Sequence, residues 1–183
     1  THRVSLMVKR AFIAGLNAAV IDVHNLRICL APVTRYMVHS LGVDAGIIVE
    51  VPEIDPRSVS IRFFDSNGME IDRISEKKIE SIFFREEFQR MLSDEVGDIV
   101  YPARTVDFYR KGVLKLLDWQ TIRKARLSVV IDCANGAGSF VAPAILGEIG
   151  CQVTTLNARL DEFAGPRTFE QVPSKLRLPR PVE

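Results

Sequence analysis

One stretch of the sequence decides the fold class: Val129-Val130-Ile131-Asp132-Cys133-Ala134-Asn135-Gly136-Ala137-Gly138-Ser139. A β-branched run, typical of a strand, leads through a glycine-rich turn into a segment with a helical pattern at 139–149. Gly150 is a typical residue at a helix C-terminus, and a second strand pattern follows at 152–156. A strand, a helix and a strand in this order predict a βαβ unit and therefore a parallel α/β architecture.

The remaining sequence shows the same alternation of helix and strand patterns. We predict a largely buried helix over 5–19 and an amphipathic helix over 75–92 with Ser75 as its N-cap. Asn67-Gly68 between apolar runs predicts a hairpin turn with a return strand beginning at Met69. Further helices are predicted at 34–41 and 105–117, further strands at 21–23, 45–51 and 58–64, and a linker at 94–102 that places a domain boundary near residue 100.

The charge balance excludes two classes of partner. The chain has 24 Lys+Arg and 23 Asp+Glu, for a net charge of +1, which gives no basic field for nucleic acid or an anionic membrane. No apolar run approaches the ~18 residues that span a bilayer. At 47% hydrophobic and 26% charged residues, the composition is that of a globular protein.

The cysteines and histidines predict neither disulfides nor a metal site. Cys29, Cys133 and Cys151 are odd in number and lie in apolar surroundings, as expected of buried free thiols. Free thiols favour a reducing compartment, so we expect a cytoplasmic protein. The three histidines have no metal-ligand spacing, and we assign no metal to the chain.

The glycine-rich turn is one candidate site. Such a turn exposes backbone N–H groups that bind phosphate at a helix N-terminus, which makes ligand-binding candidates of Asn135, Gly136, Gly138 and Ser139. Val141 stands where a dinucleotide fingerprint has its third small residue, and no lysine follows as in a Walker loop. A tight turn that needs glycine is therefore the favoured interpretation, with a small nucleotide-binding module as an alternative.

Several motifs resemble the α-D-phosphohexomutases, the phosphoglucomutase and phosphomannomutase family. The resemblance implies two α/β/α domains, both incomplete, with mixed sheets flanked by helices. Domain I covers 1–98 without its first strand, a partial domain II covers 101–165, and a proline-rich tail covers 166–183. The motifs are Lys9-Arg10-Ala11-Phe12, Asp22-Val23, Pro32-Val33-Thr34-Arg35-Tyr36, Phe63-Phe64-Asp65-Ser66-Asn67-Gly68, Val130 to Gly150 and Leu156-Asn157-Ala158.

The family's catalytic loop aligns with this chain without a gap. Family enzymes carry a phosphoserine in a T-A-S-H-N-P loop that is followed by N-G-x-K. Pro52 stands at the serine position, and Arg62 stands at the lysine position. Proline has no hydroxyl and cannot act as the nucleophile, so we assign no catalytic residue. The histidine and asparagine positions hold Glu53 and Ile54, and the N-G pair is Val59-Ser60.

The residues around Pro52 also differ in charge from a phosphate-binding loop. Glu50, Glu53 and Asp55 would repel a hexose phosphate. Ser58 and Ser60 are the possible substitutes for the missing serine, although either would need a different loop geometry. Arg57 and Arg62 are the candidates in this loop for binding a ligand.

The resemblance extends to a second kind of protein. The degenerate loop resembles the mutase-like region fused behind a nucleotidyltransferase in some bacterial mannose-1-phosphate guanylyltransferases. It implies a catalytically silent region of a sugar-nucleotide protein, with GDP-mannose as the expected product of the parent. The family's D-G-D-x-D-R metal loop is absent, so Mg is expected only if the parent is an active mutase. A fragment of an active mutase is the other alternative.

Three partners are expected. They are the rest of the parent polypeptide, a second copy of the chain through incomplete sheet edges, and a sugar phosphate.

One further residue departs from the pattern of the family that the chain resembles. Val20 stands where a glycine usually follows the family's first helix.

Overall fold

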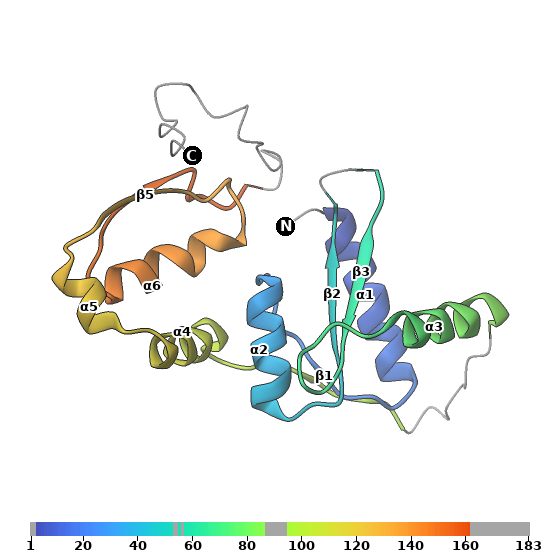
Figure 1. Ribbon diagram of the computed structural model, residues 1–183. Coiled ribbons are helices and arrows are strands. Elements are labelled where there is room, and N and C mark those ends of the chain that lie inside the picture. Colours follow the sequence, from blue (N-terminus) through green and yellow to red (C-terminus); the bar gives the residue numbers. More distant parts are fainter. Residues whose placement is uncertain (1–2, 53–54, 56, 87–94, 162–183) are drawn as a thin grey trace.

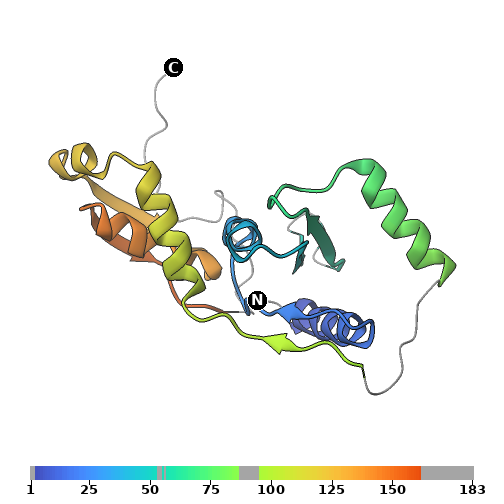
Figure 2. The ribbon, with the colours of Figure 1, turned by 90° about the horizontal axis from the view of Figure 1, so that it is seen from below.

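The computed structural model describes residues 3–52, 55, 57–86 and 95–161, which form two halves (Figures 1 and 2). The first half holds two sheets and three helices, and the second half holds one sheet and its helices. In chain order the elements are α1 Arg3–Ala18, β1 Val23–His24, α2 Ala31–Leu41, β2 Gly46–Glu50, β3 Ser60–Phe64, α3 Arg73–Arg85, β4 Ile99–Val100, α4 Thr105–Leu116, α5 Trp119–Lys124, β5 Ser128–Asp132, the 3-10 helix η1 Ala137–Phe140, α6 Ala142–Glu148 and β6 Gln152–Leu156.

In the first half, the β2–β3 hairpin lies between two helices. Successive side chains of a strand point to opposite faces, so Phe63 and Phe64 face different helices. Phe63 makes an edge-to-face contact with Phe12 of α1, at 6.5 Å between ring centroids. Phe64 is fully buried and is paired in register with Gly46, where any side chain would overlap Val38 of α2. The hairpin and its helices therefore form the α/β/α layers that the sequence predicted.

The stretch predicted as a linker contains a strand. Ile99–Val100 forms β4 and pairs in parallel with β1. The buried amide of Asn17, at the end of α1, donates to the carbonyl oxygens of Ile21 (3.1 Å) and Asp98 (3.2 Å). The prediction of a linker throughout 94–102 is wrong at β4, because the pairing partner of that strand lies some 75 residues away in sequence.

The second half is the βαβ unit predicted from the opening stretch. β5 and β6 pair in parallel from Ser128↔Gln152 to Asp132↔Leu156, and α6 packs against β6. The single helix predicted at 139–149 is instead divided into η1 and α6. Pro143 lies in the first turn of α6, where its missing N–H removes no helical hydrogen bond, so the α-helix begins at Ala142. The short helix α5 was not predicted.

A core cluster joins the two halves. Val33 and Met37 of α2 pack with Val141, which precedes α6, and all three are buried. Tyr36 of α2 makes an edge-to-face contact with Tyr109 of α4, with ring centroids 5.6 Å apart. The first-half helix α2 is therefore buried against the second half.

Three predictions for the first half need correction. The helix predicted as largely buried, α1, packs through one face only, so Val4 and Met7 are 50% and 62% exposed. Helix α3 begins at Arg73 with Asp72 as its N-cap, because the Asp72 carboxylate accepts the Ser75 N–H at 2.7 Å. The predicted return strand is a single bridge between Phe64 and Glu70, since α3 starts soon after it.

Two predicted segments cannot be compared in full, because part of the predicted helix 75–92 and the whole tail 166–183 lie outside the described residues.

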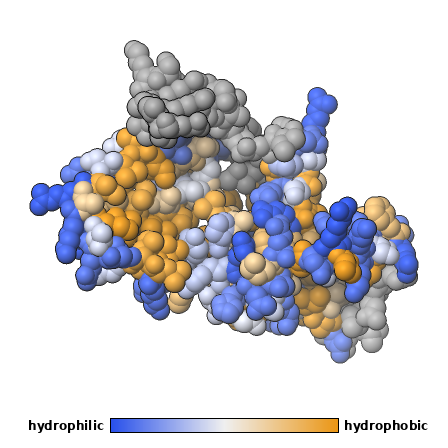
Figure 3. Space-filling model, in the orientation of Figure 1, coloured by the Kyte–Doolittle hydropathy of each residue, from blue (hydrophilic) through white to orange (hydrophobic). Residues whose placement is uncertain are grey.

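Exposed apolar surface remains on several elements. The space-filling view shows an apolar area over the second half (Figure 3). Exposed side chains in that half include Phe108, Leu116 and Phe140. In the part of the chain that the structure describes, no helix is both long enough and apolar enough to span a bilayer.

Candidate functional site

The loop that follows β2 is the first candidate site. Glu50 and Ser60 are the paired residues next to the loop that joins β2 to β3, and the structure describes residues 51, 52, 55 and 57–59 of that loop. Pro52 is half-buried two residues beyond β2. Glu53 and Ile54 lie outside the described residues.

Asp55 organises the described part of this loop. Its carbonyl oxygen accepts hydrogen bonds from the Ser58 N–H (3.1 Å) and the Ser58 hydroxyl (3.0 Å). Its carboxylate accepts the backbone N–H of Arg57 at 3.1 Å. The Ser58 hydroxyl is therefore bound to a carbonyl oxygen, which is not a base that could activate it.

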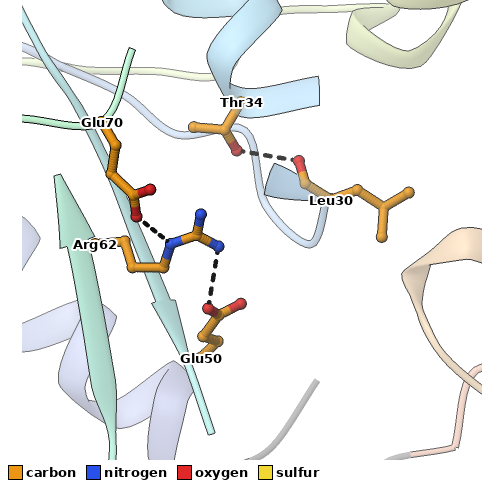
Figure 4. A network of polar contacts seen from close by, with 5 residues as sticks. All are labelled: Leu30, Thr34, Glu50, Arg62 and Glu70. Carbon is orange, nitrogen blue, oxygen red and sulfur yellow. Dashed lines mark hydrogen bonds and ion pairs between the residues drawn. The ribbon is translucent and has the colours of Figure 1, made fainter. Parts of the chain in front are cut away.

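Arg62 is held by two carboxylates at the base of the loop. Its Nε donates to Glu70 Oε1 at 2.7 Å, and its Nη1 donates to Glu50 Oε1 at 3.4 Å (Figure 4). The hydrogen bond from Arg62 lowers the pKa of Glu70, and the same contact raises the pKa of Arg62. The Arg62 guanidinium is thus paired with one carboxylate at the end of β2 and one that follows β3.

The glycine-rich turn after β5 is the second candidate site, and its backbone corrects one prediction. The residues with positive φ are Ala134 (48°) and Asn135 (55°), not the glycines that follow. Gly136 has φ −101°, and a Cβ at Gly138 would meet no atom within 4 Å. The turn geometry therefore does not require glycine at either position.

Hydrogen bonds within the turn use several of the predicted binding groups. The Ser139 hydroxyl donates to the Gly136 carbonyl oxygen at 2.8 Å, and the Gly136 N–H donates to the Cys133 carbonyl oxygen at 2.9 Å. The N–H of Asn135 donates to the carbonyl oxygen of Asn157 at 2.8 Å. These groups stabilise the turn in this structure.

An Asp–Asn pair ties the two strand ends together. The side-chain amide of Asn157 donates to both carboxylate oxygens of Asp132, at 2.9 and 3.0 Å. Asp132 also accepts the N–H of Ala134 at 2.9 Å. We did not predict this pair from the sequence. The pair could have been predicted from the positions of the two residues, because each lies at the carboxyl end of a predicted parallel strand. This is the edge at which α/β sheets carry their polar sites.

The cysteine thiols are a further set of potential nucleophiles. Burial raises the pKa of the Cys29 and Cys133 thiols, which keeps them protonated, and all three cysteines are free. Among the described residues, no group of three or more His, Cys, Asp and Glu is arranged to hold a metal ion.

Two family models match most of the chain. Residues 1–90 match the family model described as phosphoglucomutase/phosphomannomutase, alpha/beta/alpha domain I, and residues 107–177 match that of domain II. The chain belongs to the phosphoglucomutase/phosphomannomutase family. The predicted boundaries of the two domains remain a prediction.

Relatives in the family are similar over nearly the whole chain. A probable phosphoglucosamine mutase of Methanobrevibacter smithii is 31% identical over 93% of this chain and 37% of its own length. A probable phosphoglucosamine mutase of Methanothermobacter thermautotrophicus is 34% identical over 96% of this chain and 38% of its own length. A phosphoglucomutase/phosphomannomutase of Thermococcus kodakarensis is 32% identical over 85% of this chain and 34% of its own length. The chain thus spans little more than a third of the relatives it matches.

A solved structure shares the fold. The phosphoglucomutase/phosphomannomutase family protein of Burkholderia thailandensis superimposes with a TM-score of 0.69 at 20% identity. The match covers 86% of this chain and 34% of that protein. The predicted α/β/α architecture is therefore confirmed.

Proposed function

We propose that this chain is a phosphohexomutase-fold region that does not itself transfer phosphoryl groups. The observation that carries the proposal is Pro52, which stands where the family's loop has its phosphoserine. A phosphoryl transfer through the enzyme needs an oxygen nucleophile at that point, and proline has none.

The contacts of Arg62 and Ser58 support this proposal. Glu50 and Glu70 hold the Arg62 guanidinium through ion pairs, which compete with a substrate phosphate for its N–H groups. The Ser58 hydroxyl donates to a carbonyl oxygen of its own turn. Neither residue is arranged as a replacement for the family's loop residues.

We further propose a parent protein of hexose-phosphate or sugar-nucleotide metabolism. The relatives' names place them among enzymes that act on hexose phosphates. The resemblance of the degenerate loop to mannose-1-phosphate guanylyltransferases favours a role beside a nucleotidyltransferase, in packing, assembly or the sensing of a sugar phosphate. Free cysteines favour a cytoplasmic location, and the short sheets favour self-association as a further proposal.

Phosphoryl labelling tests the proposed silence. The chain is incubated with Mg and ³²P-labelled glucose 1,6-bisphosphate, beside an active phosphohexomutase as the positive control. We expect label on the control enzyme and none on this chain. Label on Ser58 or Ser60, lost in Ser58→Ala or Ser60→Ala, would contradict the proposal.

The Pro52→Ser variant separates the loss of the hydroxyl from the state of the rest of the loop. We expect this variant to stay unlabelled as well, because Arg62 remains paired with Glu50 and Glu70.

The parent protein is tested in a separate experiment, by incubating the whole protein with GTP and mannose 1-phosphate. Absence of GDP-mannose would contradict the guanylyltransferase link and leave the proposed silence intact.

A further inference from the structure

A basic hollow lies beside α5. Its volume is about 470 Å³, and every residue that lines it is exposed, so it is an open depression on the surface. No carboxylate lines it: the lining residues are Trp119, Gln120, Arg123, Lys124 and Arg126. Helix α5 lies at the end of the molecule away from the β2–β3 hairpin (Figures 1 and 2), and hydrophilic side chains project at this end in Figure 3.

Arg123 is held in place from two sides. Its guanidinium lies over the Trp119 ring, 5.3 Å from the ring centroid. Its Nη2 donates to the backbone carbonyl oxygen of Glu148 at 3.1 Å. Gly150, with φ +94°, lets the aliphatic stem of Arg123 pass close to the chain, since a Cβ there would lie 2.8 Å from Cγ. The position of this cation is therefore set before any ligand binds.

The other two cations remain available. Among the described residues, neither Lys124 nor Arg126 forms an ion pair. The nearest carboxylate in sequence, Asp118, caps the opposite end of α5, accepting the Thr121 N–H (3.2 Å) and hydroxyl (2.6 Å). In the described part of the chain, no ion pair therefore neutralises Lys124 or Arg126.

We propose that this hollow binds a nucleotide, a ligand with both a planar ring and phosphate groups. Trp119 is 41% exposed, so part of its ring is free to stack with a base. Arg123, Lys124 and Arg126 supply N–H donors for the phosphates, and guanidinium groups suit phosphate geometry. The net charge of only +1 gives little long-range attraction for a nucleic acid.

The hollow beside α5 is separate from both candidate sites. None of the residues lining the hollow belongs to the loop at 51–62 or to the turn at 133–139. A failure here would leave the labelling experiment untouched, and labelling of a serine would leave this site untouched.

Tryptophan fluorescence provides a direct test, because Trp119 is the only tryptophan in the chain. The probes are ADP and GDP, with inorganic pyrophosphate as the phosphate-only comparison, and calorimetry gives the affinity of each. We expect the nucleotides to quench Trp119 and to bind about tenfold more tightly than pyrophosphate, because only they can stack. Trp119→Ala is expected to reduce nucleotide affinity to that of pyrophosphate.

Charge reversal supplies the matched control. The double variant Lys124→Glu with Arg126→Glu should weaken nucleotide binding by about tenfold or more. Lys77→Glu with Lys78→Glu on α3 makes the same change in net charge at exposed positions and should leave binding within about twofold. Equal effects of the two double variants would overturn the proposal, and so would equal affinity for ADP and pyrophosphate. It would also be overturned if no binding occurred at roughly millimolar nucleotide, or if a single-stranded oligonucleotide bound much more tightly than ADP.

Discussion

The Arg62 guanidinium joins residues from both ends of the β2–β3 hairpin. Glu50 is the last residue of β2, and Glu70 follows the turn after β3. Both carboxylates are partly exposed, at 42% and 57%, so solvent screens the pairs and their contribution to stability is small. Their main consequence is chemical, because they occupy N–H groups of the Arg62 guanidinium that could otherwise bind an anion.

This pairing makes stability depend on pH in a defined direction. The pKa of Glu70 is lower in the folded chain than its ordinary value of 4.5, so its stabilising effect is fully present above that value and is lost as the pH falls. We expect Glu70→Gln to lower the free energy of unfolding by about 0.5 kcal/mol at neutral pH, an amount typical of exposed pairs. Urea unfolding should show the difference vanishing in acid, well below the ordinary pKa of Glu.

A control distinguishes the pair from general loss of a charge. Glu80→Gln on α3 removes an equal charge at an exposed position. A pH-dependent difference as large in Glu80→Gln as in Glu70→Gln would show that Arg62 is not the cause.

At the scale of the elements, two helices end in the same way with different residues. At the end of α2, Gly42 has φ 65°, and the N–H of Val43 donates to the carbonyl oxygen of Val38. At the end of α1, Val20 has φ 60°, and the N–H of Ile21 donates to the carbonyl oxygen of Leu16. This 6→1 pattern requires a left-handed residue, and a β-branched side chain is strained there.

We therefore expect Val20→Gly to stabilise the chain. Relief of the left-handed strain is worth roughly 1–2 kcal/mol, and the greater freedom of glycine in the unfolded chain offsets part of it. A net gain of about 1 kcal/mol should appear as a higher urea midpoint with an unchanged slope.

The reverse change at α2 is the matched control. Gly42→Val places a β-branched residue at φ 65° in open space, so its effect reports the backbone strain alone. It should destabilise the chain by a similar amount. A loss of stability in Val20→Gly would show that packing of the Val20 side chain outweighs the strain.

At the scale of the whole molecule, the two halves share a core through α2. Helix α2 packs on β2 in its own half and on α4 in the other half. Gly112 of α4 permits this approach, because a Cβ there would overlap the ring and hydroxyl of Tyr36. The stability of each half should therefore depend on the other.

Substitution of Gly112 tests this dependence. We expect Gly112→Val to destabilise the chain by roughly 1–3 kcal/mol through overpacking at Tyr36. Gly15→Val in α1 is the control, since a Cβ at Gly15 meets no atom within 4 Å. Hydrogen exchange should show lost protection in both α2 and α4 for Gly112→Val, and equal effects of the two variants would contradict a tight contact between the helices.

Much of the fold could be predicted from local sequence. The strands β5 and β6, the helix between them and the end of α2 at Gly42 follow from β-branched runs and glycine signals that act over a few residues. The start of α3 at Asp72 and the short helix α5 were missed, because several residues in each region are good caps and the local sequence does not choose among them. For the candidate site, the resemblance of the loop to the family's motif predicts Pro52 at the serine position, and this remains a prediction.

The sequence by itself determined the fold class and the absence of a hydroxyl at position 52, because both depend on residue type and local spacing. Only the tertiary structure decided that Arg62 is paired with Glu50 and Glu70, that α1 leaves one side exposed, and that Val33 and Met37 are buried against Val141. These features depend on contacts between residues far apart in the chain, and no local pattern of residues encodes such contacts.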